Sequence, residues 1–154
     1  MGLDQYLTKK TYVKNWNHMS DDEKHKVSVE GKSAKEIKPE RITHIEEEIG
    51  YWRKANQIHN WFVNNVQNGN DNCGTYYVGV EQLEELSKNC KAILADHSKA
   101  DKLLPTQSGC FFGETKYDEY YFDQLEETVE IIDGILTEMK ENEAHYEFYY
   151  ESSW

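Results

Sequence analysis

The segment from residue 42 to residue 67 carries the pattern that most constrains how this chain can fold. Large or apolar side chains recur every three or four residues from Ile42 to Val66, as they would along one face of a helix. Gly50 interrupts the pattern, so residues 41–49 form either the start of that helix or a strand that leads into it. We predict a helix over residues 51–67, which ends in the Gly- and Asn-rich sequence at 68–72.

Other segments either alternate between apolar and polar residues, which is typical of strands, or repeat with helical spacing. Strands are predicted at residues 1–8, 26–30 and 145–154, with a short extended piece at 76–78. Helices are predicted at residues 81–95 and from a cap at Asp118 to about Lys140, separated by a long loop at 103–116. This order of elements indicates a single α+β domain over residues 1–154, with about three helices packed on a small antiparallel sheet.

The chain has few aliphatic residues and many aromatic ones. Leu, Ile, Val and Phe make up about 20% of its 154 residues and 30% are charged, which is close to the composition of disordered chains. Eleven Tyr, five Phe and four Trp argue against disorder, because each packed ring buries roughly 150–250 Å². We therefore expect a folded domain whose core and surface pockets are aromatic.

The net charge of −12 is distributed unevenly along the chain. Residues 1–41 hold nine Lys and Arg against seven Asp and Glu, whereas residues 114–151 hold 13 acidic residues against two lysines. The overall balance opposes binding to duplex nucleic acid, which needs Lys and Arg to replace counterions. The acidic C-terminal quarter is interpreted as a solvated surface or, alternatively, as a mimic of nucleic acid. An anionic ligand stays compatible with this charge if its site faces away from the last helix.

Several classes of protein are excluded by what the sequence lacks. No apolar run approaches the roughly 20 residues of a membrane span, and the first residues lack the apolar core of a signal peptide. Cys73, Cys90 and Cys110 are too few and too scattered for a disulfide framework. We therefore expect a cytoplasmic protein with no membrane partner. Because known catalytic and cofactor motifs and paired histidines are missing, no catalytic, cofactor-binding or metal-binding residue is predicted.

Three clusters of aromatic and amide side chains are candidates for ligand binding. The predicted helix would bring Trp52, Asn56 and His59 onto one apolar face, with Arg53 on a neighbouring polar face. Asn56 and His59 then need partners from the protein or from a ligand, since an unpaired buried polar group costs roughly 1–3 kcal/mol. The loop at 105–113 and the aromatic residues around it would add stacking and hydrogen-bonding groups. The predicted ligand-binding residues are Trp52, Arg53, Asn56, His59, Thr106, Gln107, Ser108, Phe112, Tyr117, Tyr120 and Tyr150.

Several stretches of the chain resemble a family of small proteins encoded by bacteriophages and prophages, mostly of unassigned function. They are MGLD at residues 1–4, GYWRKANQIHNWFV at 50–63, LPTQSG at 104–109, FFG at 111–113, YDEYY at 117–121 and YYESSW at 149–154. They span nearly the whole chain. The resemblance implies a phage origin and a role in the host bacterial cytoplasm during infection, and it supplies no catalytic residues.

Ligand-like clusters without catalytic machinery, in a chain that resembles phage proteins, favour a protein that sequesters a nucleotide-derived signal of host anti-phage defence. The ligand would be an ADP-ribose derivative or a cyclic nucleotide, with Arg53 contacting its phosphate. Small binders of this kind are often homo-oligomers. One alternative is an acidic inhibitor that blocks a host defence nuclease through Glu126, Glu127 and Glu130. A second alternative is an enzyme that hydrolyses the nucleotide signal.

Overall fold

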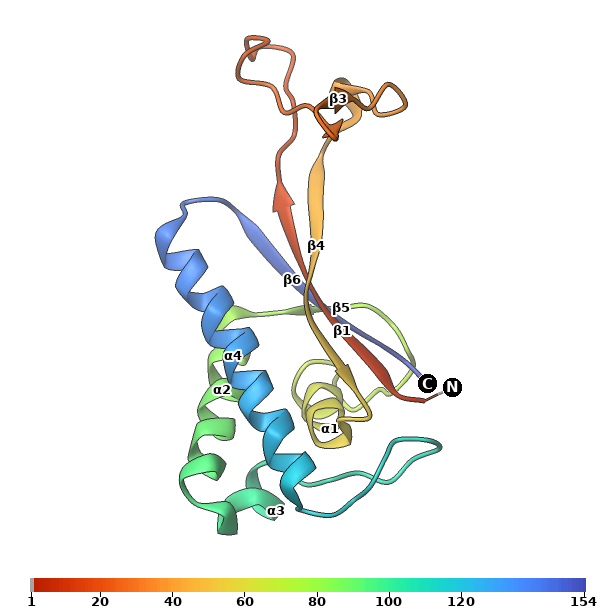
Figure 1. Ribbon diagram of the computed structural model, residues 1–154, viewed down its shortest axis with the longest axis vertical. Coiled ribbons are helices and arrows are strands. Elements are labelled where there is room, and N and C mark those ends of the chain that lie inside the picture. Colours follow the sequence, from red (N-terminus) through yellow and green to blue (C-terminus); the bar gives the residue numbers. More distant parts are fainter. Residues whose placement is uncertain (1) are drawn as a thin grey trace.

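The computed structural model describes residues 2–154 and is built around a four-stranded antiparallel sheet (Figure 1). Its strands are β1 (Asp4–Tyr12), β4 (His44–Arg53), β5 (Tyr76–Val78) and β6 (Tyr146–Ser153). They lie in the order β4-β1-β6-β5, so the first and last strands of the chain pair at the centre of the sheet. A smaller sheet pairs β2 (Ser28–Val29) with β3 (Lys32–Ser33).

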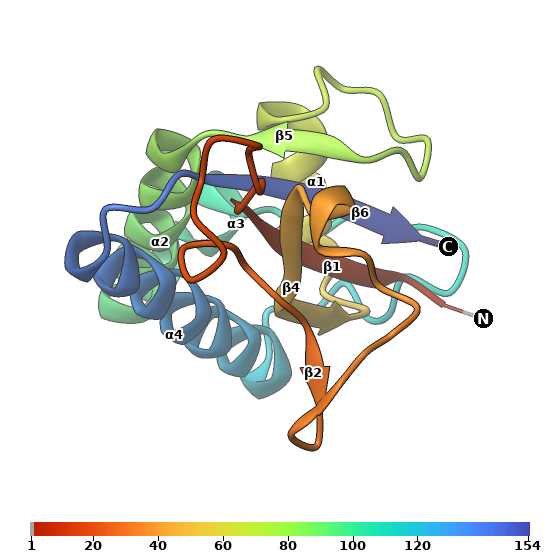
Figure 2. The same cartoon turned by 90° about the horizontal axis from the view of Figure 1, so that it is seen from above.

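The helices cover one face of the main sheet (Figures 1 and 2). They are α1 (Asn56–Asn65), α2 (Val80–Ala95), the short α3 (Ala100–Leu103) and α4 (Glu119–Glu141), with 3₁₀ turns η1 (Pro39–Arg41) and η2 (His97–Lys99). Along β1, Gln5, Leu7 and Lys9 are buried, whereas Tyr6 and Thr8 at the alternate positions are only half-buried. The predicted α+β class, with helices on a small antiparallel sheet, is therefore confirmed.

Most elements lie where the sequence patterns predict them. The extended piece at 76–78 is β5, the helix predicted at 81–95 is α2, and residues 145–154 contain β6. Asp118 caps α4 as predicted, because its side chain accepts a hydrogen bond from the backbone N–H of Tyr121 at 3.2 Å. The first strand continues to Tyr12, whereas the strand predicted at 26–30 contributes only Ser28–Val29 to a short hairpin.

The helix predicted over residues 51–67 is wrong at its start, because α1 begins only at Asn56. Residues 44–53 form β4, which was the strand alternative for residues 41–49 and extends further than expected. Residues 51–53 are strand rather than helix because their backbone pairs with β1, where they lie opposite residues 4–6. Lys54, which has a positive φ of 56°, then turns the chain toward α1.

A bulge in β4 explains why its sequence has helical spacing. Leu7 of β1 lies opposite Gly50, but the next residue of β1, Thr8, lies opposite Glu48, so Ile49 is an extra residue. The extra residue breaks the two-residue alternation and spaces the apolar residues as in a helix. Gly50 is also where α4 approaches the strand, because an added Cβ would lie 2.9 Å from Cγ2 of Ile131.

The core is aromatic, as the composition predicts. The ring of Phe62 in α1 stacks on that of Tyr150 in β6 with centroids 3.9 Å apart, and the ring of Trp52 lies 6.1 Å from Phe62. All three side chains are at most 1% exposed. The hydroxyl of Tyr121 in α4 donates to the carbonyl of Leu104 at 2.8 Å, which ties α4 to the end of α3. Stacked rings thus join the sheet to α1 where aliphatic residues are scarce.

Residues 13–43 form a lobe at the far end of the β1–β4 ribbon, beyond the helices (Figure 1). Asn15 holds the lobe together. Its Nδ2 donates to the carbonyls of His25 at 2.8 Å and Pro39 at 2.7 Å, and its Oδ1 accepts from the N–H of His25 at 2.7 Å. Only Asn15 and Ala34 are buried among the residues of this lobe, so most of its side chains face solvent.

Candidate functional site

Asn56, the first residue of α1, anchors the long loop between α3 and α4. Its Nδ2 donates to the carbonyls of Phe112 at 3.1 Å and Glu114 at 2.9 Å, and its Oδ1 accepts from the N–H of Gln107 at 2.9 Å. The side chain is 1% exposed. The sequence predicts that a buried Asn56 needs partners, and the structure supplies all three from the protein backbone.

His59 lies one turn further along α1, at the centre of a buried hydrogen-bond network. Its Nδ1 lies 2.8 Å from the hydroxyl of Tyr150, and its Nε2 lies 3.0 Å from a carboxylate oxygen of Asp71. The hydroxyl of Tyr150 also donates to Oε1 of Gln5 at 2.9 Å, which extends the network to β1. Burial, followed by the charge of Asp71, raises the pKa of Tyr150 well above its usual value. This network also reaches the C-terminus, because Trp154 Nε1 donates to Asp71 at 3.0 Å.

Five of the predicted ligand-binding residues form one contiguous cluster, in which the ring edge of Phe112 lies on His59 at a centroid distance of 5.4 Å. Their polar groups are directed mainly at one another and at the backbone, and none of them lines any of five hollows found on the described surface. Oε1 of Gln107 is buried without a partner among the described residues, so it offers an acceptor to a ligand. Ligand binding by this cluster stays a prediction. Its members are Asn56, His59, Gln107, Phe112 and Tyr150.

Trp52 and Arg53 do not lie on α1, because both belong to β4 and point to opposite faces of the sheet. Trp52 is 1% exposed and donates from Nε1 to Oγ1 of Thr128 in α4 at 2.9 Å. Arg53 is exposed, with its guanidinium 3.5 Å from Asp4. The expectation that Trp52, Asn56 and His59 share one helical face is therefore wrong, and Trp52 is a core residue.

Arg53 and Tyr120 line a shallow hollow of about 260 Å³ beside the start of α4. The hydroxyl of Tyr120 donates to the carbonyl of Arg53 at 3.1 Å. Asp123 and Glu127 of α4 line the same hollow, so the two carboxylates outnumber the single guanidinium. This balance disfavours the phosphate contact predicted for Arg53.

The other predicted residues of the α3–α4 loop stabilise the loop itself. Oγ1 of Thr106 donates to the carbonyl of Thr115 at 3.0 Å, and the hydroxyl of Tyr117 accepts from the N–H of Thr106 at 3.4 Å. Ser108 belongs to the same loop and is exposed. Thr106, Ser108 and Tyr117 therefore stay predictions as ligand contacts.

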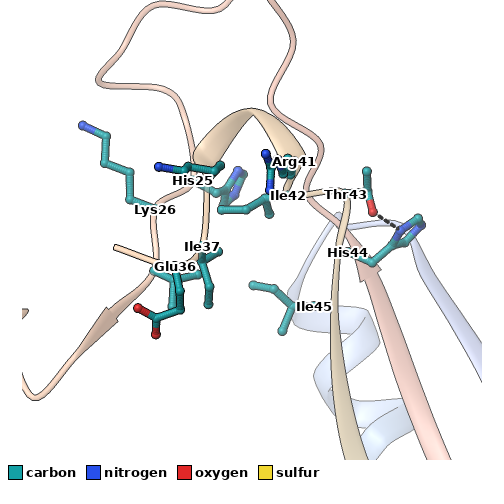
Figure 3. A pocket seen from close by; sticks show the side chains of 11 residues that line it. His25, Lys26, Glu36, Ile37, Arg41, Ile42, Thr43, His44 and Ile45 are labelled. Atoms are coloured by element: carbon teal, nitrogen blue, oxygen red, sulfur yellow. Dashed lines mark hydrogen bonds between the residues drawn. The ribbon is translucent and has the colours of Figure 1, made fainter. Parts of the chain in front are cut away.

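The most voluminous of the five hollows, about 450 Å³, lies where the lobe meets the start of β4 (Figure 3). Residues 25–27, 36–38 and 41–45 line it. Ile37 and Ile45 approach each other from two sides of the hollow, and they are 42% and 47% exposed. Exposed isoleucines at a concave surface are typical of a binding site, because apolar groups of this size are usually buried.

Basic side chains surround these isoleucines. The charged residues that line the hollow are three cations and one anion, so its net charge is +2 with both histidines neutral. His44 is held by its own neighbour, with Nδ1 3.1 Å from Oγ1 of Thr43. The hollow therefore combines an apolar floor with a cationic rim. The titratable residues of the rim are His25, Lys26, Glu36, Lys38, Arg41 and His44.

Sequence reasoning missed this hollow, although one of its signals was present. The first 41 residues are mildly basic, with nine Lys and Arg against seven acidic residues. The apolar part of the site shows no periodicity, because Ile37, Ile42 and Ile45 come from a loop, a turn and a strand. Only the folding of residues 25–45 back on themselves brings these side chains together.

No protein-family model, curated protein or solved structure matches the chain. Among residues 2–154, no helix is both long and apolar enough to cross a membrane. The same residues contain no cluster of three or more His, Cys, Asp or Glu side chains arranged to hold a metal ion. The function must therefore be inferred from the geometry of the sites themselves.

Proposed function

We propose that the protein binds a nucleotide-like anion in the hollow between the lobe and β4. One observation carries the proposal: Ile37 and Ile45 leave apolar surface exposed in a concave site of about 450 Å³, with Lys26, Lys38 and Arg41 at its rim. A base would pack on the apolar floor, and a phosphate would pair with the cations. Arg41 suits this role because a guanidinium presents two parallel donors to a phosphate.

The charge distribution requires a site for an anion to lie away from the last helix, and the position of this hollow meets that requirement. The acidic residues of the chain are concentrated in α4 and around it, whereas the hollow is lined by residues 25–45. The hollow beside Arg53 lies directly against α4, and its carboxylates would repel an anion. The hollow of the lobe is therefore the better site for an anionic ligand.

The proposed activity is sequestration, in which the ligand is bound without being changed. The resemblance to phage and prophage proteins is the reason to select a signalling nucleotide of host anti-phage defence, either an ADP-ribose derivative or a cyclic nucleotide. Sequestration in the host cytoplasm would lower the free concentration of that signal. Hydrolysis of the same nucleotide is the competing activity, and analysis of the recovered ligand distinguishes the two.

Calorimetric titration with ADP-ribose and a panel of cyclic mono- and dinucleotides tests this proposal. We expect one of these compounds to bind, and we expect Lys38→Gln/Arg41→Gln to weaken its binding about tenfold or more. The matched control is Lys99→Gln/Lys102→Gln, which removes two exposed cations elsewhere and should leave binding unchanged. Chromatography of the recovered ligand should show it intact. Absence of binding at tens of micromolar would overturn the proposal, and loss of binding in Arg53→Ala alone would move the site to the hollow beside α4.

A second candidate function is inhibition of a host defence nuclease by the acidic surface of α4. The observation that favours it is that Glu126, Glu127 and Glu130 are all exposed on this helix. Neutralising all three as Gln should abolish inhibition, and added salt should weaken the complex steeply because the contact is electrostatic. An inhibitor unaffected by both changes would exclude this function.

A further inference from the structure

The main sheet has a second face, which the helices leave uncovered (Figure 2). Tyrosines and carboxylates occupy it. Tyr6 of β1 lies beside Tyr51 of β4 with ring centroids 5.5 Å apart, and Tyr77 of β5 packs edge-on against Tyr149 of β6 at 6.0 Å. Tyr51 and Tyr77 are 39% and 60% exposed. A face with this much exposed aromatic surface lacks a partner within the described chain.

A hollow of about 270 Å³ lies across the middle of this face. Tyr6 and Tyr149 form aromatic parts of its wall, and three carboxylates stand around it against one lysine. Glu46 and Glu48 of β4 make no ion pair and no side-chain hydrogen bond with the described residues, and Glu151 of β6 accepts only the hydroxyl of Thr75, at 2.8 Å. The charged residues that line the hollow are Lys10, Glu46, Glu48 and Glu151.

The chain itself shows that a cation is accommodated here. Nζ of Lys10 lies over the ring of Tyr149 at 5.6 Å from its centroid, within the range of a cation–π contact. The same tyrosine donates its hydroxyl to Glu147 at 2.9 Å, which raises its pKa and keeps the phenol neutral. The electron-rich ring and the free carboxylates therefore favour positive charge at the same place.

We propose that this open sheet face is a docking surface for a basic segment of another protein, with an arginine side chain seated in the hollow. A guanidinium stacks on a tyrosine ring while its N–H groups pair with carboxylates, and it loses less hydration than an ammonium group. Tyr6 and Tyr149 offer the rings, and Glu46 and Glu48 offer unpaired acceptors. The net charge of −2 around the hollow complements such a segment.

A second copy of this chain is a poor occupant. Residues 1–41 of such a copy are only weakly cationic, because seven acidic residues offset nine basic ones. The edge strand β4 also carries three consecutive glutamates at 46–48, which would repel each other in an edge-to-edge pair. The proposal is independent of the anion-binding hollow, which lies in the lobe and is lined by different residues.

Fluorescence anisotropy with a labelled oligoarginine peptide tests this docking surface, with oligolysine and oligoglutamate peptides of equal length as comparisons. The decisive variant is Glu46→Gln/Glu48→Gln, and the matched control is Glu126→Gln/Glu127→Gln, which removes the same charge from α4. All four glutamates are exposed, so both variants should unfold at nearly the wild-type temperature. We expect oligoarginine to bind more tightly than oligolysine, the sheet-face variant to lose about tenfold in affinity, and the α4 variant to lose much less.

Several results would overturn the proposal. An equal loss in the two variants means that the peptide responds only to the bulk charge of the protein. A larger loss in the α4 variant assigns basic partners to that helix. Equal binding of free spermine at the same charge concentration means that the hollow takes a small polyamine. Self-association that Glu46→Gln/Glu48→Gln abolishes means that the occupant is a second copy. If Tyr149→Leu still binds oligoarginine more tightly than oligolysine, the ring of Tyr149 does not select arginine.

Discussion

Replacing Asn56 by Ala should detach the α3–α4 loop from α1. The side chain is 1% exposed and makes three hydrogen bonds to the loop backbone, at 3.1, 2.9 and 2.9 Å. Each is worth roughly 0.5–1.5 kcal/mol, and the carbonyls and N–H left behind are partly shielded from water. We therefore expect the free energy of unfolding to fall by about 2–4 kcal/mol. For a chain of this length, that corresponds to a fall in melting temperature of roughly 6–12 °C.

Urea unfolding followed by tryptophan fluorescence and circular dichroism measures this change. Limited proteolysis should show faster cleavage at residues 105–116 in Asn56→Ala, because the loop loses its anchor. The control is Asn64→Ala in the same helix. Asn64 is exposed and bonds within α1, to the backbone and side chain of Asn60, so its loss should cost less than about 0.5 kcal/mol.

An isosteric variant separates the hydrogen bonds from the volume of the side chain. Asn56→Asp keeps the acceptor for Gln107 but directs a carboxylate oxygen at the carbonyls of Phe112 and Glu114. We expect it to be at least as unstable as Asn56→Ala at neutral pH and to recover in part on acidification, when the protonated carboxyl can donate. If Asn56→Ala differs from Asn64→Ala by less than 1 kcal/mol and the loop is cleaved no faster, the reasoning is refuted.

Three further predictions concern the core and the attachment of α4. Burial raises the pKa of the Cys90 thiol from 9.0 to about 12, so the folded state holds this proton longer than the unfolded state and loses stability as pH rises from 9 to 12. Cys90→Ala should flatten that part of the pH profile in urea unfolding; an unchanged slope would contradict this. The side chain of Lys9 is 5% exposed, and its Nζ lies 2.7 Å from a carboxylate oxygen of Glu138. Lys9→Ala should therefore lower the free energy of unfolding by about 2 kcal/mol and speed hydrogen exchange at the end of α4. Unaltered exchange there would disprove this. Gly50→Ala places a Cβ 2.9 Å from Ile131, which should lower the unfolding free energy by about 1–3 kcal/mol in a calorimetric melt, unlike an alanine at the uncrowded Gly134.

Local sequence patterns determined the elements that depend on their own residues. The apolar spacing of α2 and α4 follows the helical period, and Asp118 caps α4 through a bond to Tyr121 only three residues away. The alternation in residues 145–154 likewise marks β6. The aromatic composition also determined the kind of core, because stacked rings such as Phe62 and Tyr150 supply the buried area that aliphatic residues do not.

Charge distribution along the sequence set one condition on a site for an anion, that it face away from the last helix, but it did not locate the site. The basic first 41 residues contain the cations of the lobe hollow. The candidate residues were instead selected for aromatic and amide groups, and the requirement that Asn56 and His59 find partners was correct. Those partners are the backbone of the α3–α4 loop, Asp71 and Tyr150, which lie 12 to 91 residues away in sequence.

Only the tertiary structure decided the extent of β4 and the surfaces that stay open, because both depend on contacts between segments far apart in the sequence. Residues 51–53 are strand rather than helix since β1 lies beside them, and the bulge at Ile49 hides that pairing in the sequence. The uncovered sheet face and the hollow of the lobe are likewise defined by which segments meet and which surfaces remain free. A local pattern reports the preference of a segment for helix or strand, whereas burial of Trp52 and exposure of Ile37 are set by what folds against them.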